Sequence, residues 1–345
     1  MLNLSRKIAH LSPLPRAPKF DATAAEARPV RVAVVGVGEM GRRHVRVLAA
    51  HVGFEVVGVV DASPRAAAAA ARELAVPHLA SAADAHAAAD VVVVATPIGA
   101  HDEGVLAALE ASRHVLVEKP ICGSFADAER LLALARARGA QLFVGHSERF
   151  NPVVRALVAR VAPSDVHALD FWREGPPRGA RRTDDGVLLN LGVHDIDLVA
   201  LIAGGPATRR RAEGNESRAL LTLQAQGGAL ARVRVDRGAL TRRRAVTLTT
   251  ATHVYEGDLL TPRLTVTPRR GGRSVDVTLD GCEPLLAQAQ ALHDALHGRA
   301  AAIATGLDGA RALAIAERAS HLTLGTSKEA AMGSAAPAAA LAEKL

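Results

Sequence analysis

The chain has 345 residues, 49% of them hydrophobic and 22% charged, as in a globular protein large enough for two domains. Its longest purely apolar stretches are only as long as a strand, so no membrane-spanning helix is predicted. The net charge of +7 invites a nucleic-acid partner, but the basic residues are scattered and the aromatic content is 2%, which argues against one. Two cysteines in a chain of this length favour a reduced, cytoplasmic setting.

Short apolar runs alternate with amphipathic stretches from residue 30 to about residue 145. Strands are predicted over residues 31–35, 55–60, 91–95, 114–117 and 141–144, and helices over residues 39–51, 64–74, 103–111 and 125–138. This alternation predicts a parallel, doubly wound sheet. The preceding residues, 1–29, lack the apolar core of a signal peptide and are predicted to form a flexible arm.

The second half of the chain has a different pattern. The predicted elements are a helix over 153–161, a strand over 166–173, a helix over 192–203, strands over 219–225, 229–235, 245–250 and 274–279, and helices over 284–297 and 309–322. Successive strands without intervening helices predict a large, mostly antiparallel open sheet. The alanine-rich residues 327–345 are predicted to be a flexible tail.

A glycine-rich segment, GVGEMG at residues 36–41, connects the first predicted strand to the first predicted helix. This order matches the dinucleotide-binding fingerprint of a Rossmann domain. Gly36 permits the tight turn, Gly38 lets a pyrophosphate approach the backbone at the helix N-terminus, and Gly41 permits close packing of helix against strand. Residues 30–150 are therefore predicted to be a nucleotide-binding domain.

Asp61 ends the second predicted strand, about twenty residues after Gly41. At that position a carboxylate accepts hydrogen bonds from both ribose hydroxyls of NAD and repels a 2′-phosphate. We therefore predict NAD as the cofactor, although the nearby Ser63 and Arg65 leave NADP open.

Lys119 is the only lysine between Lys19 and Lys328 in a chain whose 42 basic residues are nearly all arginine. Arginine cannot lose its proton in a protein, whereas a desolvated lysine can. A lysine kept at the end of a predicted strand in the nucleotide-binding domain therefore indicates proton transfer.

Three further segments accompany the glycine fingerprint: Ala95-Thr96-Pro97 with His101, Glu118-Lys119-Pro120, and GVLLNLGVHDID at residues 186–197. In this order and spacing they closely resemble the glucose–fructose oxidoreductase and inositol dehydrogenase (Gfo/Idh/MocA) family. The resemblance extends from about residue 30 to residue 324, and GHSERFNP at residues 145–152 also fits it.

The resemblance implies a Rossmann domain followed, over residues 151–326, by an α/β domain that binds substrate and forms homodimers or homotetramers through its sheet. It implies hydride transfer between a nicotinamide and a sugar or cyclitol carbon, with Lys119 at the reacting hydroxyl and His194 sharing the substrate proton. An ammonium near the positive nicotinamide in a closed pocket should have a lowered pKa, so Lys119 can act as a base. The Lys119-Pro120 bond is expected to be cis, as in this family.

We accordingly predict catalytic, cofactor and substrate contacts, and no metal. The catalytic set is Lys119, His194 and Asn190. The cofactor set is Gly36, Gly38, Glu39, Met40, Gly41, Asp61, Thr96, Pro97, His101, Glu118 and Lys119. The substrate set is Lys119, Arg149, Asn151, Arg178, Arg181, Asn190 and His194. His293 and His297, four residues apart, have no third ligand in view and are interpreted as surface or packing residues.

The sequence departs from the family at Asn190, where many members have an aspartate four residues before the histidine. Asparagine keeps the hydrogen-bonding capacity but loses the charge, so His194 loses a carboxylate that would favour its protonated form. Asp195 and Asp197 are candidates to compensate. A cofactor-binding protein without turnover therefore stays open as an alternative function.

The predicted substrate is a nucleotide-activated amino sugar that reacts at C3. The arginines Arg173, Arg178, Arg181 and Arg182 precede the catalytic helix, and the planar guanidinium suits a diphosphate. A solvated loop or a subunit contact is the alternative for these arginines. Alternative activities are an NAD-dependent glycosidase and an inositol or free-sugar dehydrogenase.

Overall fold

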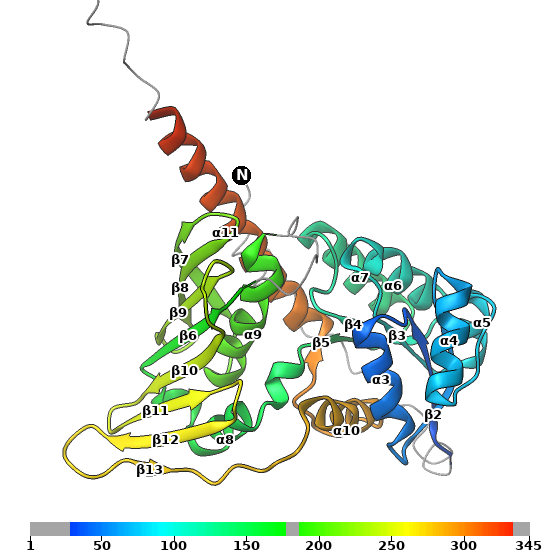
Figure 1. Ribbon diagram of the computed structural model, residues 1–345, viewed down its shortest axis with the longest axis horizontal. Helices are drawn as coiled ribbons and strands as arrows, with labels where there is room; N and C mark the ends of the chain where they lie inside the picture. Colours follow the sequence, from blue (N-terminus) through cyan, green and yellow to red (C-terminus); the bar gives the residue numbers. More distant parts are fainter. Residues whose placement is uncertain (1–27, 177–185, 334–345) are drawn as a thin grey trace, which may run out of the picture. The chain divides into compact units, whose positions relative to one another are not determined.

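The computed structural model describes residues 28–176 and 186–333, with side chains as far as His321 (Figure 1). Its described residues form two compact units. Unit 1 runs to Arg160 and also includes Thr278–Ala314, whereas unit 2 comprises Val161–Val277 and the residues from Ile315 onward. Unit 1 is thus not the continuous segment 30–150 that the sequence predicted, because a late part of the chain returns to it.

Unit 1 contains a six-stranded sheet with the strand order β14-β5-β4-β3-β1-β2. Its strands are β1 (Val30–Val35), β2 (Phe54–Val60), β3 (Val91–Val94), β4 (His114–Glu118), β5 (Leu142–Gly145) and β14 (Ala304–Thr305). The first five are parallel neighbours, as predicted, and β14 pairs antiparallel with β5. The late strand β14 was not predicted, since two residues carry no readable pattern.

The helices of unit 1 include one that the sequence pattern did not reveal. They are α3 (Glu39–Ala49), α4 (Pro64–Leu74), α5 (Ala82–Ala88), α6 (His101–Glu110), α7 (Phe125–Ala137), α8 (Pro152–Arg160) and α10 (Pro284–Leu296), with short 3-10 turns η1 (Ile98–Ala100) and η2 (Ser147–Phe150). The unpredicted α5 is rich in alanine and has no apolar stripe. Its available signal was the N-cap, where Ser81 accepts a hydrogen bond from the backbone N–H of Asp84 at 3.1 Å.

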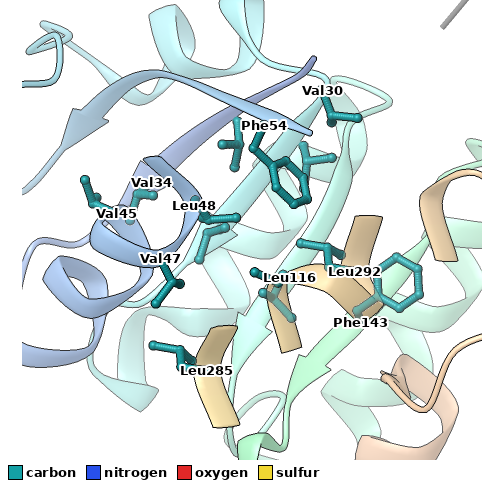
Figure 2. Packing of buried hydrophobic residues seen from close by; sticks show 14 of the residues in the cluster. Val30, Val34, Val45, Val47, Leu48, Phe54, Leu116, Phe143, Leu285 and Leu292 are labelled. Atoms are coloured by element: carbon teal, nitrogen blue, oxygen red, sulfur yellow. The ribbon is translucent and has the colours of Figure 1, made fainter. Parts of the chain in front are cut away.

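One face of the unit 1 sheet is covered by helices from both ends of the chain. Val47 and Leu48 of α3 belong to the same buried cluster as Leu285 and Leu292 of α10 (Figure 2). Figure 1 also shows α10 beside α3. The apolar face of a parallel sheet must be buried, and α10 supplies part of that cover although it lies more than two hundred residues further along the chain.

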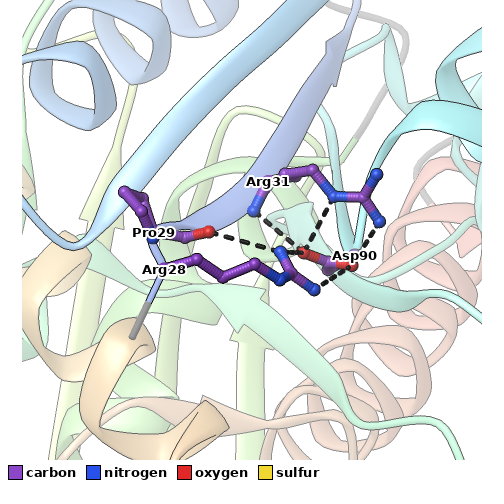
Figure 3. Close-up of polar contacts among 4 residues, drawn as sticks. All are labelled: Arg28, Pro29, Arg31 and Asp90. Carbon is purple, nitrogen blue, oxygen red and sulfur yellow. Dashed lines mark hydrogen bonds and ion pairs between the residues drawn. The ribbon is translucent and has the colours of Figure 1, made fainter. Parts of the chain in front are cut away.

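An ion cluster fastens the start of β1 to the start of β3 (Figure 3). The Asp90 carboxylate accepts hydrogen bonds from Arg28 at 2.7 Å, from the Arg31 side chain at 2.9 Å and from the Arg31 backbone N–H at 3.0 Å. Burial alone would raise the pKa of Asp90, but these hydrogen bonds and the arginine charges hold it well below its usual range. Asp90 is therefore ionised over the physiological pH range.

Unit 2 contains an eight-stranded, mostly antiparallel sheet with the order β13-β12-β11-β10-β6-β9-β8-β7. Its strands are β6 (Ala168–Glu174), β7 (Ala207–Gly214), β8 (Arg218–Ala225), β9 (Leu230–Asp236), β10 (Arg243–Thr249), β11 (His253–Asp258), β12 (Arg263–Pro268) and β13 (Val275–Asp276). Among the described strands of this second sheet, only β6 and β9 pair in parallel. The predicted α/β class, with a parallel Rossmann sheet and a second, mostly antiparallel sheet, is confirmed.

Two further helical segments differ from the expected ones, and the second of them contributes residues to both units. Helix α9 (Val193–Ile202) is preceded by a π-helix, η4 (Leu188–Gly192), that the sequence did not predict. Helix α11 (Gly306–Gly333) extends past residue 327, where a flexible tail was predicted. Residues 328–332, KEAAM, are strong helix formers with no proline among them, and Gly333 suits a helix end. Flexibility of residues 327–345 stays a prediction.

No helix among the described residues is both long enough and apolar enough to cross a membrane.

Candidate nucleotide and catalytic site

The glycine-rich turn between β1 and α3 is packed tightly against the end of β3. Gly36 has a φ of +94°, and a Cβ there would lie 2.7 Å from the carbonyl carbon of Ala95. A Cβ on Gly41 would lie 1.8 Å from the carbonyl oxygen of Gly36. Any larger residue at either position would displace the backbone, so the turn and packing roles predicted for these glycines are confirmed.

At Gly38, neither the backbone conformation nor a close contact within the protein requires a glycine. Its φ of −64° is accessible to every residue, and apart from its chain neighbours no atom of the described residues that could obstruct a Cβ lies within 4 Å of where that Cβ would be. It is the N-cap of α3 and provides no side-chain cap for that helix. An open backbone at a helix N-terminus fits a pyrophosphate, so these residues are compatible with a bound dinucleotide.

Asp61 lies beside this turn, directly after β2. Its Oδ2 accepts a hydrogen bond from the backbone N–H of Val37 at 2.9 Å, and its Oδ1 accepts one from Ser63 at 2.9 Å. The carboxylate is thereby fixed next to the glycine-rich turn. Each carboxylate oxygen can accept more than one hydrogen bond, so Asp61 keeps capacity for ribose hydroxyls.

His101 joins the segments that follow β3 and β4. Its buried ring has Nδ1 at 2.8 Å from the carbonyl oxygen of Pro120 and Nε2 at 2.9 Å from that of Thr96. Burial lowers the pKa of His101, although the two carbonyls and the charge of Glu118 oppose this. The described hydrogen bonds of His101 are made within the protein, and a direct cofactor contact stays a prediction, as it does for the exposed Pro97 and Glu39 and for Met40.

The segment Glu118-Lys119-Pro120 follows β4, and its Lys119-Pro120 bond is cis, as predicted. Lys119 is partly buried. The Glu118 side chain is also buried, and its Oε1 lies 2.7 Å from Nε2 of His44. The sequence analysis did not identify His44. Its signal was its position on the fingerprint helix, three residues after Gly41 and therefore on the same inward face.

Arg149 and Asn151, which were predicted to bind substrate, are both buried in unit 1. Arg149 donates a hydrogen bond to the carbonyl oxygen of Ala302 at 3.3 Å and lies 3.5 Å from Asp308. Asn151 accepts a hydrogen bond from the backbone N–H of Val153 at 3.1 Å, at the start of α8. Their described contacts hold unit 1 together, and substrate binding by them stays a prediction.

Unit 2 carries the predicted Asn190 and His194, both half-buried. The Asn190 N–H donates to the carbonyl oxygen of Gly186 at 3.1 Å, so helical structure has begun before Asn190. Asn190 and His194 are four residues apart, so within helical structure their side chains can share a helix face, with the extra residue of a π-helical turn between them. Such turns occur frequently at functional sites.

Arg173 and Asp195 form a buried, bidentate ion pair in unit 2. Arg173 donates to the two carboxylate oxygens of Asp195 at 2.9 and 2.7 Å, and the side chains are 3% and 1% exposed. Arg173 is therefore buried and paired, and its membership of the arginine cluster predicted to bind a diphosphate stays a prediction. Arg173 also neutralises the carboxylate of Asp195, which was a candidate to compensate for the carboxylate that is missing at Asn190. The other arginines of that cluster, Arg178, Arg181 and Arg182, lie outside the described residues.

His293 packs against Phe54, His51 and His297 in unit 1. Burial and the charges around it lower its pKa to about 4. Within the described ranges, no three His, Cys, Asp or Glu side chains are grouped in a way that would hold a metal ion.

Comparison with known proteins agrees with this architecture. The family model Gfo/Idh/MocA, described as an oxidoreductase family with an NAD-binding Rossmann fold, matches residues 30–146. A solved structure of the UDP-N-acetylglucosamine 3-dehydrogenase GnnA from Acidithiobacillus ferrooxidans superposes with a TM-score of 0.79 at 25% identity, over 86% of this chain and 98% of that one. Residues 30–146 of this chain thus match the Gfo/Idh/MocA oxidoreductase family, and its fold is that of the GnnA structure.

Within this family, named relatives differ in substrate. The 4-carboxy-2-hydroxymuconate-6-semialdehyde dehydrogenase of Sphingobium sp. is 32% identical over 51% of this chain and 59% of its own length. The sequence of the UDP-N-acetylglucosamine 3-dehydrogenase of Acidithiobacillus ferrooxidans is 31% identical over 54% of this chain and 58% of its own length. The chain thus matches less than two thirds of the length of either relative.

Proposed function

We propose that this protein is an NAD-dependent oxidoreductase that transfers hydride between the nicotinamide and a sugar carbon. The observation that carries the proposal is the arrangement within unit 1, where Asp61 is bonded to the glycine-rich turn and His101 ties the segment after β3 to the Lys119-Pro120 segment. Cofactor and proton-transfer residues predicted from separate motifs are thus attached to neighbouring strands of one sheet.

The residues of the chain have distinct parts in this proposal. The backbone at Gly38 and the N-terminus of α3 would hold the pyrophosphate, and Asp61 would hold the adenosine ribose. The nicotinamide, when bound, would accept or supply the hydride. Lys119 would take the proton of the reacting hydroxyl, since a neutral amine is a suitable base near neutral pH. His194 is proposed to share that proton, as the family resemblance implies.

We propose a nucleotide-activated amino sugar, reacting at C3, as the substrate. Similarity to UDP-N-acetylglucosamine 3-dehydrogenase supports this class. Similarity to the 4-carboxy-2-hydroxymuconate-6-semialdehyde dehydrogenase, to the same extent, means that the assignment has to be tested.

The experiment is a spectrophotometric assay of NAD reduction with UDP-N-acetylglucosamine, free hexoses and myo-inositol. We expect the nucleotide sugar to react fastest. Lys119→Ala should reduce kcat about 10²- to 10⁴-fold while NAD binds nearly as in wild type, because the lysine transfers a proton and does not grip the cofactor. Lys119→Arg should be almost as inactive. Faster turnover of inositol or glucose would overturn the substrate assignment, and an active arginine variant would overturn Lys119 as the base.

A second candidate, cofactor binding without turnover, is favoured by Asn190 together with the pairing of Asp195 to Arg173. Asn190→Asp distinguishes the two functions. A gain in kcat and a shifted pH profile would indicate a dehydrogenase weakened by the amide. If wild type and Asn190→Asp both bind NAD, and neither turns over any of the three substrate classes, the second candidate is favoured.

A further inference from the structure

A buried acid–histidine pair lies directly beside the proposed base. His44 of α3 and Glu118 of β4 are 3% and 10% exposed, with 2.7 Å between His44 Nε2 and Glu118 Oε1. The other carboxylate oxygen, Oε2, accepts a hydrogen bond from the backbone N–H of Lys119 at 3.3 Å. Both oxygens of Glu118 therefore have donors, and one of the donors belongs to Lys119 itself.

The Glu118 carboxylate has little room to turn. A Cβ on Gly145 of β5 would lie 2.9 Å from Glu118 Oε1, so the carboxylate rests against the backbone of the next strand. Burial disfavours its charged form, but the hydrogen bond from His44 and the charges of His44 and Lys119 outweigh burial and lower the pKa of Glu118. Glu118 is therefore a fixed negative charge at neutral pH.

A fixed carboxylate next to Lys119 opposes the role proposed for that lysine. An opposite charge nearby favours the ammonium form, whereas a base has to lose its proton. The other titratable or charged groups whose charges act here are His44 from α3 and His101 from α6, with Asp102 beside His101. Of these, His44 is the one that donates a hydrogen bond to the Glu118 carboxylate.

We propose that His44 is a positioning residue, which binds the Glu118 carboxylate and limits how strongly its charge stabilises the ammonium form of Lys119. His44 acts through Glu118, and it links the helix of the dinucleotide fingerprint to the proton-transfer segment. The inference rests on the proposed function, in which Lys119 is the base.

The test measures the protonation of Lys119 without requiring turnover. The full-length protein is labelled with acetic anhydride across a pH series, and acetylation of Lys119 is read by mass spectrometry. The neutral amine is the form that reacts, so the midpoint follows the loss of the proton. Only five lysines are present in the chain, which keeps the readout simple.

In His44→Leu the midpoint should rise by about one pH unit, because Glu118 loses its partner and acts more strongly on Lys119. In Glu118→Gln it should fall below that of wild type, and His44→Leu/Glu118→Gln should reverse the rise and match Glu118→Gln, because His44 acts through the Glu118 charge. The acid limb of the kcat profile should move in the same directions. A merely structural role would lower the melting temperature of His44→Leu without this reversal.

The outcomes separate the two proposals. An unchanged Lys119 midpoint in His44→Leu would overturn the role of His44, even if Lys119→Ala is inactive. Should His44→Leu fail to fold, an unchanged midpoint in Glu118→Gln would overturn it equally, because the charge of Glu118 would then not act on Lys119. If the midpoints move as expected while Lys119→Ala stays active, the inference about His44 stands and Lys119 is not the base.

Discussion

The two sheets of this protein bury their strands in different ways. All four residues of β3, Val91–Val94, are fully buried, whereas β9, Leu230–Asp236, alternates between exposed and buried positions. A doubly wound parallel sheet has helices on both faces, so its functional groups are placed where the strands end. Asp61 and Lys119 directly follow β2 and β4 in this way.

The unit 2 sheet has room for polar groups along its strands. On the exposed side of β9, Arg232 pairs with Asp170, and Arg234 lies 5.7 Å from the centre of the Trp172 ring. On the covered side, β6 carries Arg173, which is compatible with burial because Asp195 neutralises it. In unit 1, the effect of a substitution on function should therefore depend on how near the residue is to the end of its strand. In unit 2, the effect of a substitution on stability should depend on whether the side chain lies on the covered or the exposed face of the sheet.

The largest loss of stability is expected at the buried ion pair of unit 2. Arg173→Leu should lower the free energy of unfolding by about 3–5 kcal/mol, because Asp195 is left as an uncompensated buried charge. The double variant Arg173→Leu/Asp195→Leu should recover most of this loss. Urea unfolding measures both. A single variant that costs less than about 1 kcal/mol would show that the covered face tolerates an unpaired charge.

Neighbouring positions on one strand give a sharper test of the comparison. Val92→Thr and Val93→Thr should each lower the free energy of unfolding by about 1–3 kcal/mol, because both place a hydroxyl in the core of unit 1. In unit 2, Val233→Thr should have a similar effect and Arg232→Thr one of less than about 1 kcal/mol, since Arg232 is exposed. Thermal unfolding of the four variants measures this. Equal losses at positions 232 and 233 would contradict the one-sided burial of β9.

The ion cluster at the opposite strand ends of unit 1 should respond to pH. Asp90→Ala should lower the free energy of unfolding at pH 7 by about 1–3 kcal/mol, because the partly buried N–H of Arg31 loses its acceptor. The pKa of Asp90 is depressed in the folded state, so its contribution is complete above the unfolded pKa of about 3.9 and is lost as the pH falls toward the folded value.

The measurement for Asp90 is denaturant unfolding of wild type and Asp90→Ala between pH 7 and pH 2. The difference between them should stay constant from pH 7 to about pH 5 and shrink in more acidic buffer. A difference that grows on acidification would have the wrong sign for a depressed carboxyl pKa.

The smallest effect is expected at the partly exposed strand end beside the glycine-rich turn. Asp61→Ala should change the ratio of NAD to NADP affinity about tenfold in favour of NADP, or about 1.4 kcal/mol, because it removes the repulsion of a 2′-phosphate. Arg65→Ala, in the exposed residues that follow, is the matched control and should leave NAD affinity within about twofold. Titration of each protein with both cofactors measures this. Equal NAD affinity in wild type and Asp61→Ala would contradict the role of Asp61.

The sequence by itself determined most of what depends on near neighbours. The strands of the Rossmann sheet are apolar runs next to turn residues, so β1 to β5 were predicted to within a residue or two at their ends. The cofactor turn was readable for the same reason, because Gly36 and Gly41 have their functions within one turn and the helix after it. In unit 2, strands β8 and β9 were predicted to within a residue at their ends.

Only the tertiary structure decided which distant residues meet. Helix α10 and strand β14 complete unit 1 from the far end of the chain, because an uncovered sheet face and edge accept any segment of suitable shape and polarity. No local pattern distinguishes Arg173 from an arginine that binds a ligand, or His44 from any other helical histidine. Their pairing with Asp195 and Glu118 follows from burial, since a charge removed from water has to find a partner wherever the fold brings one.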